Sequence, residues 1–286
     1  MLLHSFAIAP PTEHVFVCTD GSPAMRPAIG TATLVAERTG AALHLLHVQE
    51  RDEAAHRARR DTVERTAAEL GATADILTAG RGRAAAHPAL PIGEYLGGFE
   101  AALPCTSTHG RNGVGQTIFG SVTAELVRGG GLPVLVLGPS AVAPERLSRV
   151  VACTDGSAFA AEILPAAAGL ARDLDVPLWI VEVLDADRAP RDGDVAESAT
   201  VRRLAHDLAS TGLDVEWDVL HGRDTVAAIG RFADLQPGTV TALATHGRGG
   251  VVGTLVGSVA RAVTRHTAGP TLIYRPKSLD APTGTA

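Results

Sequence analysis

The sequence predicts an α/β protein built from two tandem copies of one doubly wound, parallel-sheet domain. Three observations support this prediction: a long internal repeat, short apolar runs of strand length, and helical segments that alternate with those runs. The chain has 286 residues, of which 45% are hydrophobic and 20% charged. This length and composition are sufficient for two ordinary globular domains, each with its own core.

The repeat is carried by two motifs. VFVCTDGS, ending at Ser22, returns as VVACTDGS, ending at Ser157. STHGRNGVGQTIFGSV, starting at Ser107, returns as ATHGRGGVVGTLVGSV, starting at Ala244. The spacing, from 22 to 157 and from 107 to 244, is too long for a solenoid repeat and fits a whole domain. We place domain one at 1–143 and domain two at 144–286, with a linker at 139–148 and a loose tail from 277.

Six apolar runs predict strands. They are nearly continuous, as expected for parallel strands that are covered on both faces, and they span 15–18, 43–48 and 134–137 in the first copy and 150–153, 178–183 and 271–274 in the second. Between the first two runs, Ser22 and Pro23 read as an N-cap and a first helical residue, and Gly40 reads as the helix end. Further helices are expected at 54–70 and 196–211. The alternation implies right-handed crossovers within a doubly wound sheet.

Two motifs in each copy are expected at one edge of the sheet. Asp20 follows one strand directly, and Thr108, His109 and Gly110 follow another, so both should lie where ligands of open α/β sheets bind. From Gly110 a glycine-rich loop runs to Gly120 and Ser121, where a helix begins near Val122 and offers a phosphate site. Two plainer interpretations stay open: the aspartate may only complete a turn, and the histidine may only organise its loop.

Several functions lose support because the residues they need are missing. Lys277 is the only lysine, so neither copy has a P-loop or a Schiff-base lysine, and no GxGxxG or GxSxG is found. The net charge of −6 argues against nucleic-acid or anionic-membrane partners. Cys18, Cys105 and Cys153 have no zinc-ligand spacing and are expected to be free thiols. With no signal peptide and no membrane-spanning run, we expect a cytoplasmic protein without catalytic or metal-binding residues.

At these motifs the sequence resembles the universal stress protein family in its tandem two-domain form. The family motif is Gly, two residues, Gly, nine residues, Gly, then Ser or Thr. Its later elements match at Gly110, Gly120 and Ser121 and again at Gly247, Gly257 and Ser258. The resemblance covers both copies, from about residue 13 to 276. It implies five parallel strands per domain and domains that pair within the chain as the subunits of a homodimer would, and leaves open a dimer of tandem chains.

The resemblance also implies an adenine-nucleotide site in each domain, taking ATP with or without Mg²⁺. The strand-end aspartate would contact adenine, an apolar residue of the second strand would pack on the base, and the glycine loop would hold phosphates. In this sequence those positions are Asp20, Leu43, Thr108, His109, Gly110, Arg111, Gly120, Ser121 and Val122 in domain one, and Asp155, Leu178, Thr245, His246, Gly247, Arg248, Gly257, Ser258 and Val259 in domain two.

One motif element departs from the family. Its first glycine is replaced by Ser107 and by Ala244, and a Cβ there would cost ~1 to 2 kcal/mol if the backbone needed a positive φ. We therefore expect a stress-response module that binds ATP in each domain and signals to unknown protein partners. The alternatives are an interaction module of the same fold that no longer binds nucleotide and, as the least favoured, a slow ATPase.

Overall fold

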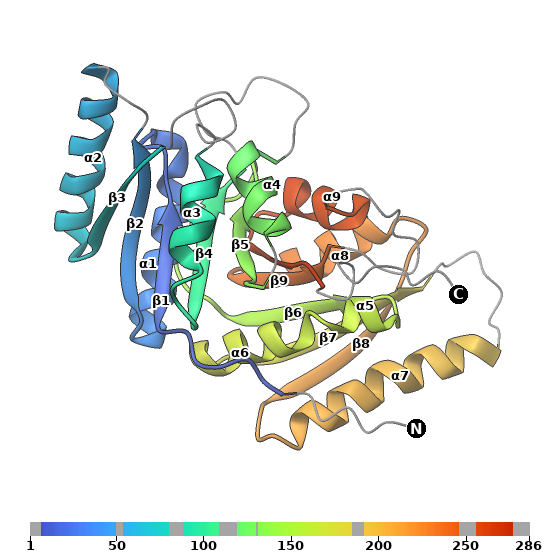
Figure 1. Ribbon diagram of the computed structural model, residues 1–286. Helices are drawn as coiled ribbons and strands as arrows, with labels where there is room; N and C mark the ends of the chain where they lie inside the picture. Colours follow the sequence, from blue (N-terminus) through green and yellow to red (C-terminus); the bar gives the residue numbers. More distant parts are fainter. Residues whose placement is uncertain are drawn as a thin grey trace, which may run out of the picture.

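The computed structural model describes residues 7–49, 54–79, 88–108, 119–129, 131–184, 192–245 and 256–276. These residues form one sheet of ten strands (Figure 1). From one edge to the other, the strands are β3 (Thr73–Thr78), β2 (Ala42–Gln49), β1 (His14–Cys18), β4 (Ala102–Ser107), β5 (Val134–Leu137), β10 (Thr271–Tyr274), β9 (Thr239–Ala244), β6 (Arg149–Thr154), β7 (Leu178–Leu184) and β8 (Val215–His221). Strands are parallel within each half, and the halves meet where β5 and β10 pair antiparallel.

Helices cover both faces of this sheet. One face carries α1 (Arg26–Thr39), α2 (Ala54–Leu70), α6 (Leu164–Leu174) and α7 (Asp192–Ala209). The other carries α3 (Ala89–Leu96), α4 (Ser121–Arg128), α8 (Thr225–Asp234) and α9 (Ser258–His266). Short turns, the 3-10 helix η1 (Pro23–Met25) and α5 (Ala158–Ala161), follow β1 and β6. The predicted pair of doubly wound, five-stranded parallel domains is confirmed.

Local sequence explains where the first helix of each domain begins and ends. Gly40 ends α1 with φ +74°, a left-handed conformation that glycine adopts without steric cost. The expected cap at Ser22 is only partly right, because this residue precedes η1 and its side chain makes no capping bond. Its counterpart does cap, since the Ser157 hydroxyl accepts a hydrogen bond from the N–H of Ala160 at 3.1 Å.

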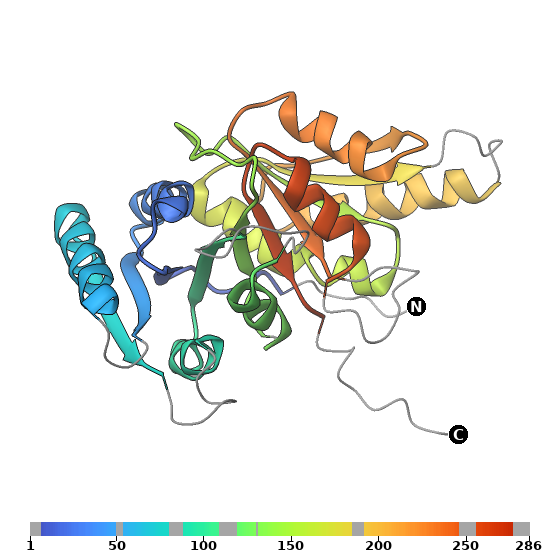
Figure 2. The ribbon, with the colours of Figure 1, turned by 90° about the horizontal axis from the view of Figure 1, so that it is seen from above.

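The two domains share cores across their junction. On one face α1 lies beside α6, as Figure 2 shows, and the Arg38 guanidinium donates to the Leu174 carbonyl at 2.6 Å. On the other face, Val127 of α4 and Val263 of α9 belong to one buried cluster. The segment before β1 also crosses to domain two, where the N–H of Ala9 donates to the Pro165 carbonyl at 3.1 Å. The predicted intramolecular pairing of domains is therefore present as a continuous sheet with shared cores.

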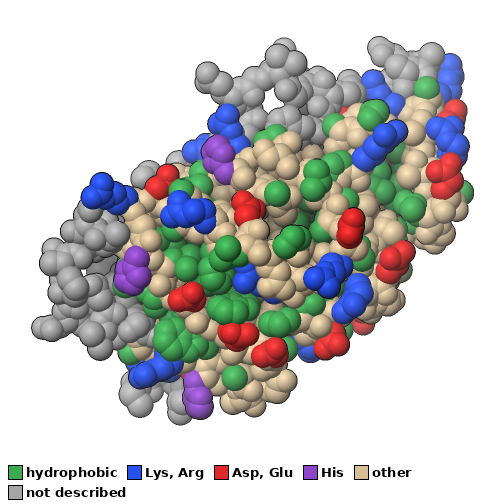
Figure 3. Space-filling view, turned by 180° about the vertical axis from the view of Figure 1, so that it is seen from behind, with side chains coloured by type: hydrophobic (Ala, Val, Ile, Leu, Met, Phe, Trp, Pro, Cys, Tyr) green, Lys and Arg blue, Asp and Glu red, His purple; other side chains and the backbone are tan. Residues whose placement is uncertain are grey.

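Charges of both signs are distributed over the described part of the face drawn in Figure 3. Figure 3 shows arginine side chains interspersed with aspartate and glutamate on the described part of one face. No described helix is long and apolar enough to cross a membrane. The expectation that nucleic acid is not a partner stays a prediction.

Candidate functional site

The order of the strands defines one edge in each domain where two loops leave the sheet together. In domain one the chain passes from β1 to β2 on one side and from β4 to β5 on the other, so strand order reverses between β1 and β4. Val17 of β1 is opposite Cys105 of β4, and the segments that follow these strands emerge side by side. The same arrangement occurs between β6 and β9, where Ala152 is opposite Ala242. These are the places where open α/β sheets bind ligands.

The turn after β1 is held by its own side chains. The N–H of Gly21, with φ +74°, donates to the Thr19 hydroxyl at 3.0 Å. The N–H of Ser22 donates to the Asp20 carboxylate at 2.9 Å. Domain two repeats both bonds at Gly156 and Asp155, at 3.1 and 3.0 Å. In each domain one carboxylate oxygen of the aspartate therefore completes a local turn.

A helix N-terminus lies beyond the strand end on the other side of the edge. Gly120, the N-cap of α4, has φ −59° and ψ 158°, and Gly257, the N-cap of α9, has φ −58° and ψ 155°. The N–H of Gly257 donates to the Thr245 carbonyl at 2.6 Å. A Cβ on Gly120 would lie 3.6 Å from the Thr108 carbonyl oxygen. In both domains the helix start is therefore placed directly beside the strand-end threonine, with first-turn N–H groups that the helix itself cannot pair.

Thr108 and Thr245 are buried and extend the sheet by one residue. Their N–H groups donate to the carbonyls of Leu137 and Tyr274 at 2.9 and 2.8 Å. Beyond the N-caps, Val122 and Val259 stand second in α4 and α9, after Ser121 and Ser258, and pack against the cores of the same face. The structure thus brings Asp20, Thr108, Gly120, Ser121 and Val122 to one edge and repeats the set in domain two.

The two residues that replace the first motif glycine have unstrained backbone conformations. Ser107 and Ala244 are the last residues of β4 and β9, and Asp175 is the only non-glycine residue with positive φ in the described chain. The cost expected from a positive φ is therefore absent at both positions.

The expectation for Leu43 and Leu178 is wrong. Leu43 is opposite Val15, at the start of β1, and Leu178 is the first residue of β7, opposite Val150. Both lie at the amino ends of their strands, about four residues from the carboxyl edge, which is roughly 13 Å in a parallel strand. They cannot join Asp20 or Asp155. At the carboxyl end of β2 stand His47 and Val48, and Glu182 and Val183 are their counterparts in β7.

His47 is a supporting residue that sequence reasoning missed. Its buried ring donates from Nδ1 to the Thr19 carbonyl at 2.9 Å, immediately before Asp20. The available signal was a histidine inside an apolar strand, two residues from its end. In domain two the buried residue at this position is Glu182, so the two sites differ beneath the aspartate turn.

The thiols at the edge are held in the neutral form. Cys18 and Cys153 are the residues before Thr19 and Thr154, and burial raises the pKa of each to about 12. They are free and buried, as is Cys105. Within the described ranges, no group of three or more His, Cys, Asp or Glu side chains could hold a metal ion. His109, Gly110, Arg111, His246, Gly247 and Arg248 lie outside the described residues.

Comparison with known proteins agrees with the repeat and the fold. The model of the universal stress protein family matches residues 11–138 and 147–275. Among solved structures, a universal stress protein from Archaeoglobus fulgidus aligns with a TM-score of 0.61 and 17% identity, covering 92% of this chain and 98% of that one. A functionally unknown protein from Pseudomonas aeruginosa aligns with a TM-score of 0.61 and 19% identity, covering 94% and 95%. A search of curated proteins gave no match.

Proposed function

The chain belongs to the universal stress protein family, and from this premise we propose that each domain binds an adenine nucleotide, ATP, as a regulatory module of a stress response. The observation that supports the proposal most is the duplication of the site itself. In each domain an aspartate turn and a glycine-capped helix start lie at the strand-order reversal, with matching backbone conformations.

The chemistry of the edge suits a phosphate-bearing ligand. The first N–H groups of α4 and α9, together with the positive ends of the helix dipoles, favour an anion without any lysine. Three or four such bonds at roughly 1.5 to 3 kcal/mol each, with a buried base, are consistent with about micromolar affinity, which needs roughly 8 kcal/mol. Mg²⁺ usually binds through substrate phosphates, so it would enter with the nucleotide, at the phosphate end of the site.

We propose a binding role and no catalytic one. The buried thiols at the edge are poor nucleophiles because their pKa values are raised to about 12. One carboxylate oxygen of Asp20, and one of Asp155, already accepts a hydrogen bond within its own turn. Nucleotide occupancy would then change how the domains present themselves to protein partners.

Titration calorimetry of the purified chain with ATP and Mg²⁺ tests the proposal. We expect two sites per chain with about micromolar dissociation constants, and one remaining site in either Gly120→Val or Gly257→Val. The extended conformation of both glycines admits a valine, so loss of binding in these variants would reflect a blocked site. Gly93→Ala, in open space on α3, is the matched control and should bind as the wild type does. No heat at hundreds of micromolar ATP would refute the proposal and leave the interaction module.

A further inference from the structure

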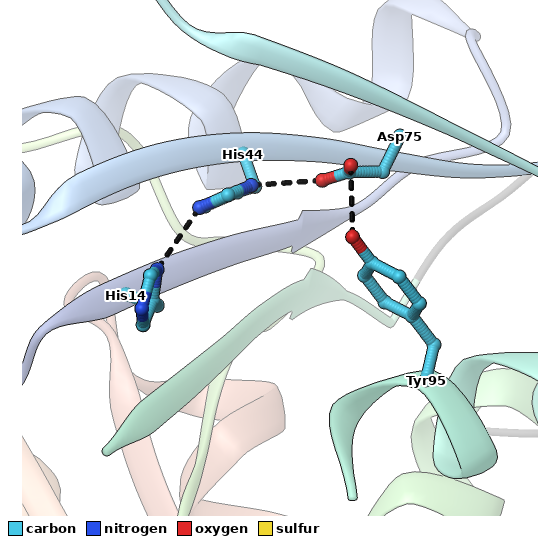
Figure 4. A network of polar contacts seen from close by, with 4 residues as sticks. All are labelled: His14, His44, Asp75 and Tyr95. Carbon is cyan, nitrogen blue, oxygen red and sulfur yellow. Dashed lines mark hydrogen bonds and ion pairs between the residues drawn. The ribbon is translucent and has the colours of Figure 1, made fainter. Parts of the chain in front are cut away.

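A chain of four polar side chains crosses the sheet of domain one, away from the candidate site. Figure 4 shows these side chains in a row, each in contact with the next: His14 of β1, His44 of β2, Asp75 of β3 and Tyr95 of α3. His14 Nδ1 lies 3.1 Å from His44 Nε2, and His44 Nδ1 lies 2.8 Å from Asp75 Oδ2. The Tyr95 hydroxyl donates to Asp75 Oδ1 at 2.9 Å. This row of hydrogen-bonded side chains therefore connects three strands to the helix that covers them.

The contact between the two imidazole rings can hold only one proton. An ionised Asp75 accepts and does not donate, so His44 Nδ1 carries a hydrogen and donates it. On the line between the rings, either His14 Nδ1 donates to a neutral His44, or a charged His44 donates from Nε2 to a neutral His14. A second proton would set two N–H donors and two positive charges 3.1 Å apart. The folded network thus accepts at most one of the two protons that the histidines bind when separated.

Aromatic side chains and groups without charge surround the two rings. Phe16, Tyr95 and Phe99 pack around them, with Phe16 stacked on His44 at a centroid distance of 4.4 Å. The other titratable groups of this cluster are neutral at physiological pH: burial raises the pKa of Cys18 to about 12, and burial and then the bond to Asp75 raise the pKa of Tyr95. Glu13 and Glu94 are exposed, and Glu125 of α4 pairs with Arg128.

Domain two fills the same position with a group that does not titrate. Arg149 is placed in β6 as His14 is in β1, since each is opposite the first residue of the fourth strand. Trp179 corresponds to His44, because Val151 is opposite Trp179 as Phe16 is opposite His44. The Arg149 guanidinium lies 4.6 Å from the Phe232 ring centroid and 5.7 Å from that of Trp179. An arginine keeps its charge throughout the acid range.

We propose that the His14–His44 contact is an acid-operated switch that releases α3 in domain one and thereby weakens its nucleotide site, while domain two does not respond. Separated histidines can each bind a proton in acid, whereas the closed network binds one at most. Acid therefore favours the opened state. This opening reaches the site through α4, because α3 packs on α4 and Val122 belongs to the same cluster as Tyr95 and Phe99.

Hydrogen exchange of the full chain at pH 7.5, 6.5 and 5.5, corrected for intrinsic exchange, tests the switch. A difference of one bound proton changes an equilibrium constant by up to tenfold per pH unit. We expect the opening constant of α3 to rise by up to about tenfold per unit more than that of α8, the matched helix of domain two. Equal pH dependence of α3 and α8 would overturn the proposal.

The variant His14→Asn removes one titrating ring and leaves an amide that can still bond to His44. We expect its α3 to match the wild type at pH 7.5 and to lose the excess response to acid, and an excess that persists would overturn the proposal. Phe232 corresponds to Tyr95, since it lies as far along the chain from Tyr95 as Ala244 lies from Ser107. Should His14→Asn unfold α3 at neutral pH, the triple variant His14→Arg, His44→Trp and Tyr95→Phe, which copies domain two, replaces it with the same expectation.

The regulatory step rests on the proposed function and is measured separately. ATP affinity is compared at pH 7.5 and 5.5 in Gly257→Val, which keeps site one, and in Gly120→Val, which keeps site two. Protonation of ATP itself affects both variants equally, so we expect an additional loss of affinity in site one, in proportion to the fraction of chains in which α3 has opened. Equal losses would overturn the regulatory step. An absence of binding at every pH would refute the proposed function, while hydrogen exchange would still decide the switch.

Discussion

Asp20 Oδ1 accepts a hydrogen bond from the backbone N–H of Ser22 at 2.9 Å. Variants of Asp20 can therefore distinguish its role in this turn from a role in binding the ligand. An asparagine side chain offers a carbonyl oxygen at the same place, without charge. We expect Asp20→Asn to change the free energy of unfolding by less than about 0.5 kcal/mol and Asp20→Ala to lower it by about 1 kcal/mol, the usual net value of one such bond. Urea unfolding measures both.

The same pair of variants tests contact with the ligand. If the charge of Asp20 meets the nucleotide, Asp20→Asn in the Gly257→Val background should lower ATP affinity at least tenfold while the turn stays intact. Unchanged affinity would mean that the aspartate serves the turn alone. Asp155→Asn in the same background is the control, because site two is already blocked there.

Gly138 makes the junction of the domains sensitive to one methyl group. A Cβ at this position, directly after β5, would lie 1.8 Å from the Thr264 carbonyl oxygen of α9. Backbone cannot move away as a side-chain end can, so we expect Gly138→Ala to destabilise the chain by about 3 kcal/mol. Thermal unfolding would show the loss. Gly230→Ala in α8 is the control: it meets nothing within 4 Å and should stabilise by about 0.5 to 1 kcal/mol. Equal stability of the two variants would contradict this expectation and would mean that the backbone at the junction moves to admit the methyl group at little cost.

The three buried thiols predict slow modification and a loss of stability in alkali. Burial raises the pKa of Cys18 and Cys153 to about 12 and also raises that of Cys105. At pH 8 the thiolate fraction is then roughly a thousandfold below that of an ordinary cysteine, so native protein should react with a thiol reagent only as it unfolds. Fast reaction of all three thiols without denaturant would contradict this expectation.

The same shifts fix the sign of the alkaline effect. Above about pH 9 the unfolded chain releases thiol protons that the folded chain keeps, so the folded state binds more protons and stability falls as pH rises toward 12. Urea midpoints from pH 7 to 10 should decrease, and Cys153→Ala should flatten the decrease. A flat profile in the wild type would show that the thiols titrate normally.

Strands could be predicted where they are both buried and almost wholly apolar; β4 and β9 are buried too, but Pro104 and threonines interrupt their apolar pattern, and no bounds were predicted for them. The runs at 134–137 and 271–274 coincide with β5 and β10, which pair in the middle of the sheet. The edge strands β3 and β8 were not found, because their residues are half-buried or exposed and include polar side chains such as Asp75 and Glu216. An apolar run is a signal of burial, and edge strands carry too little of it.

The site could be predicted only as far as the repeat marks its loops. Asp20 and Asp155 follow β1 and β6, and Gly120 and Gly257 precede α4 and α9, as expected. Leu43 was misplaced because apolar residues along a buried strand look alike, and only the register with β1 shows which end reaches the edge. The buried polar groups of domain one were also beyond reach, since partners such as His44 and Asp75 are 31 residues apart in sequence.

Arg149 connects β6 to its neighbours in domain two, at the position that His14 occupies in domain one. Its Nε donates to the Thr239 hydroxyl at 3.0 Å, and a terminal nitrogen donates to the Phe232 carbonyl at 2.5 Å. Burial lowers the pKa of the guanidinium and Glu216 opposes this effect, so the group stays charged at neutral pH.

Loss of this side chain leaves two buried acceptors without their donor and removes a cation from the Phe232 ring. We expect Arg149→Ala to destabilise domain two by about 3 kcal/mol, the sum of a charge-assisted bond and a cation–π contact. Arg149→Lys keeps the charge but cannot donate in both directions from a planar fork, so it should recover only about half of the lost stability.

Trp179 and Trp217, the two tryptophans, both lie in domain two, and their fluorescence follows its unfolding in urea. Arg172→Lys, at an ion pair on α6 whose arginine is half-buried, is the matched control and should stay within about 0.5 kcal/mol of the wild type. Full recovery by lysine would mean that charge alone, and not the geometry of the guanidinium, stabilises this position.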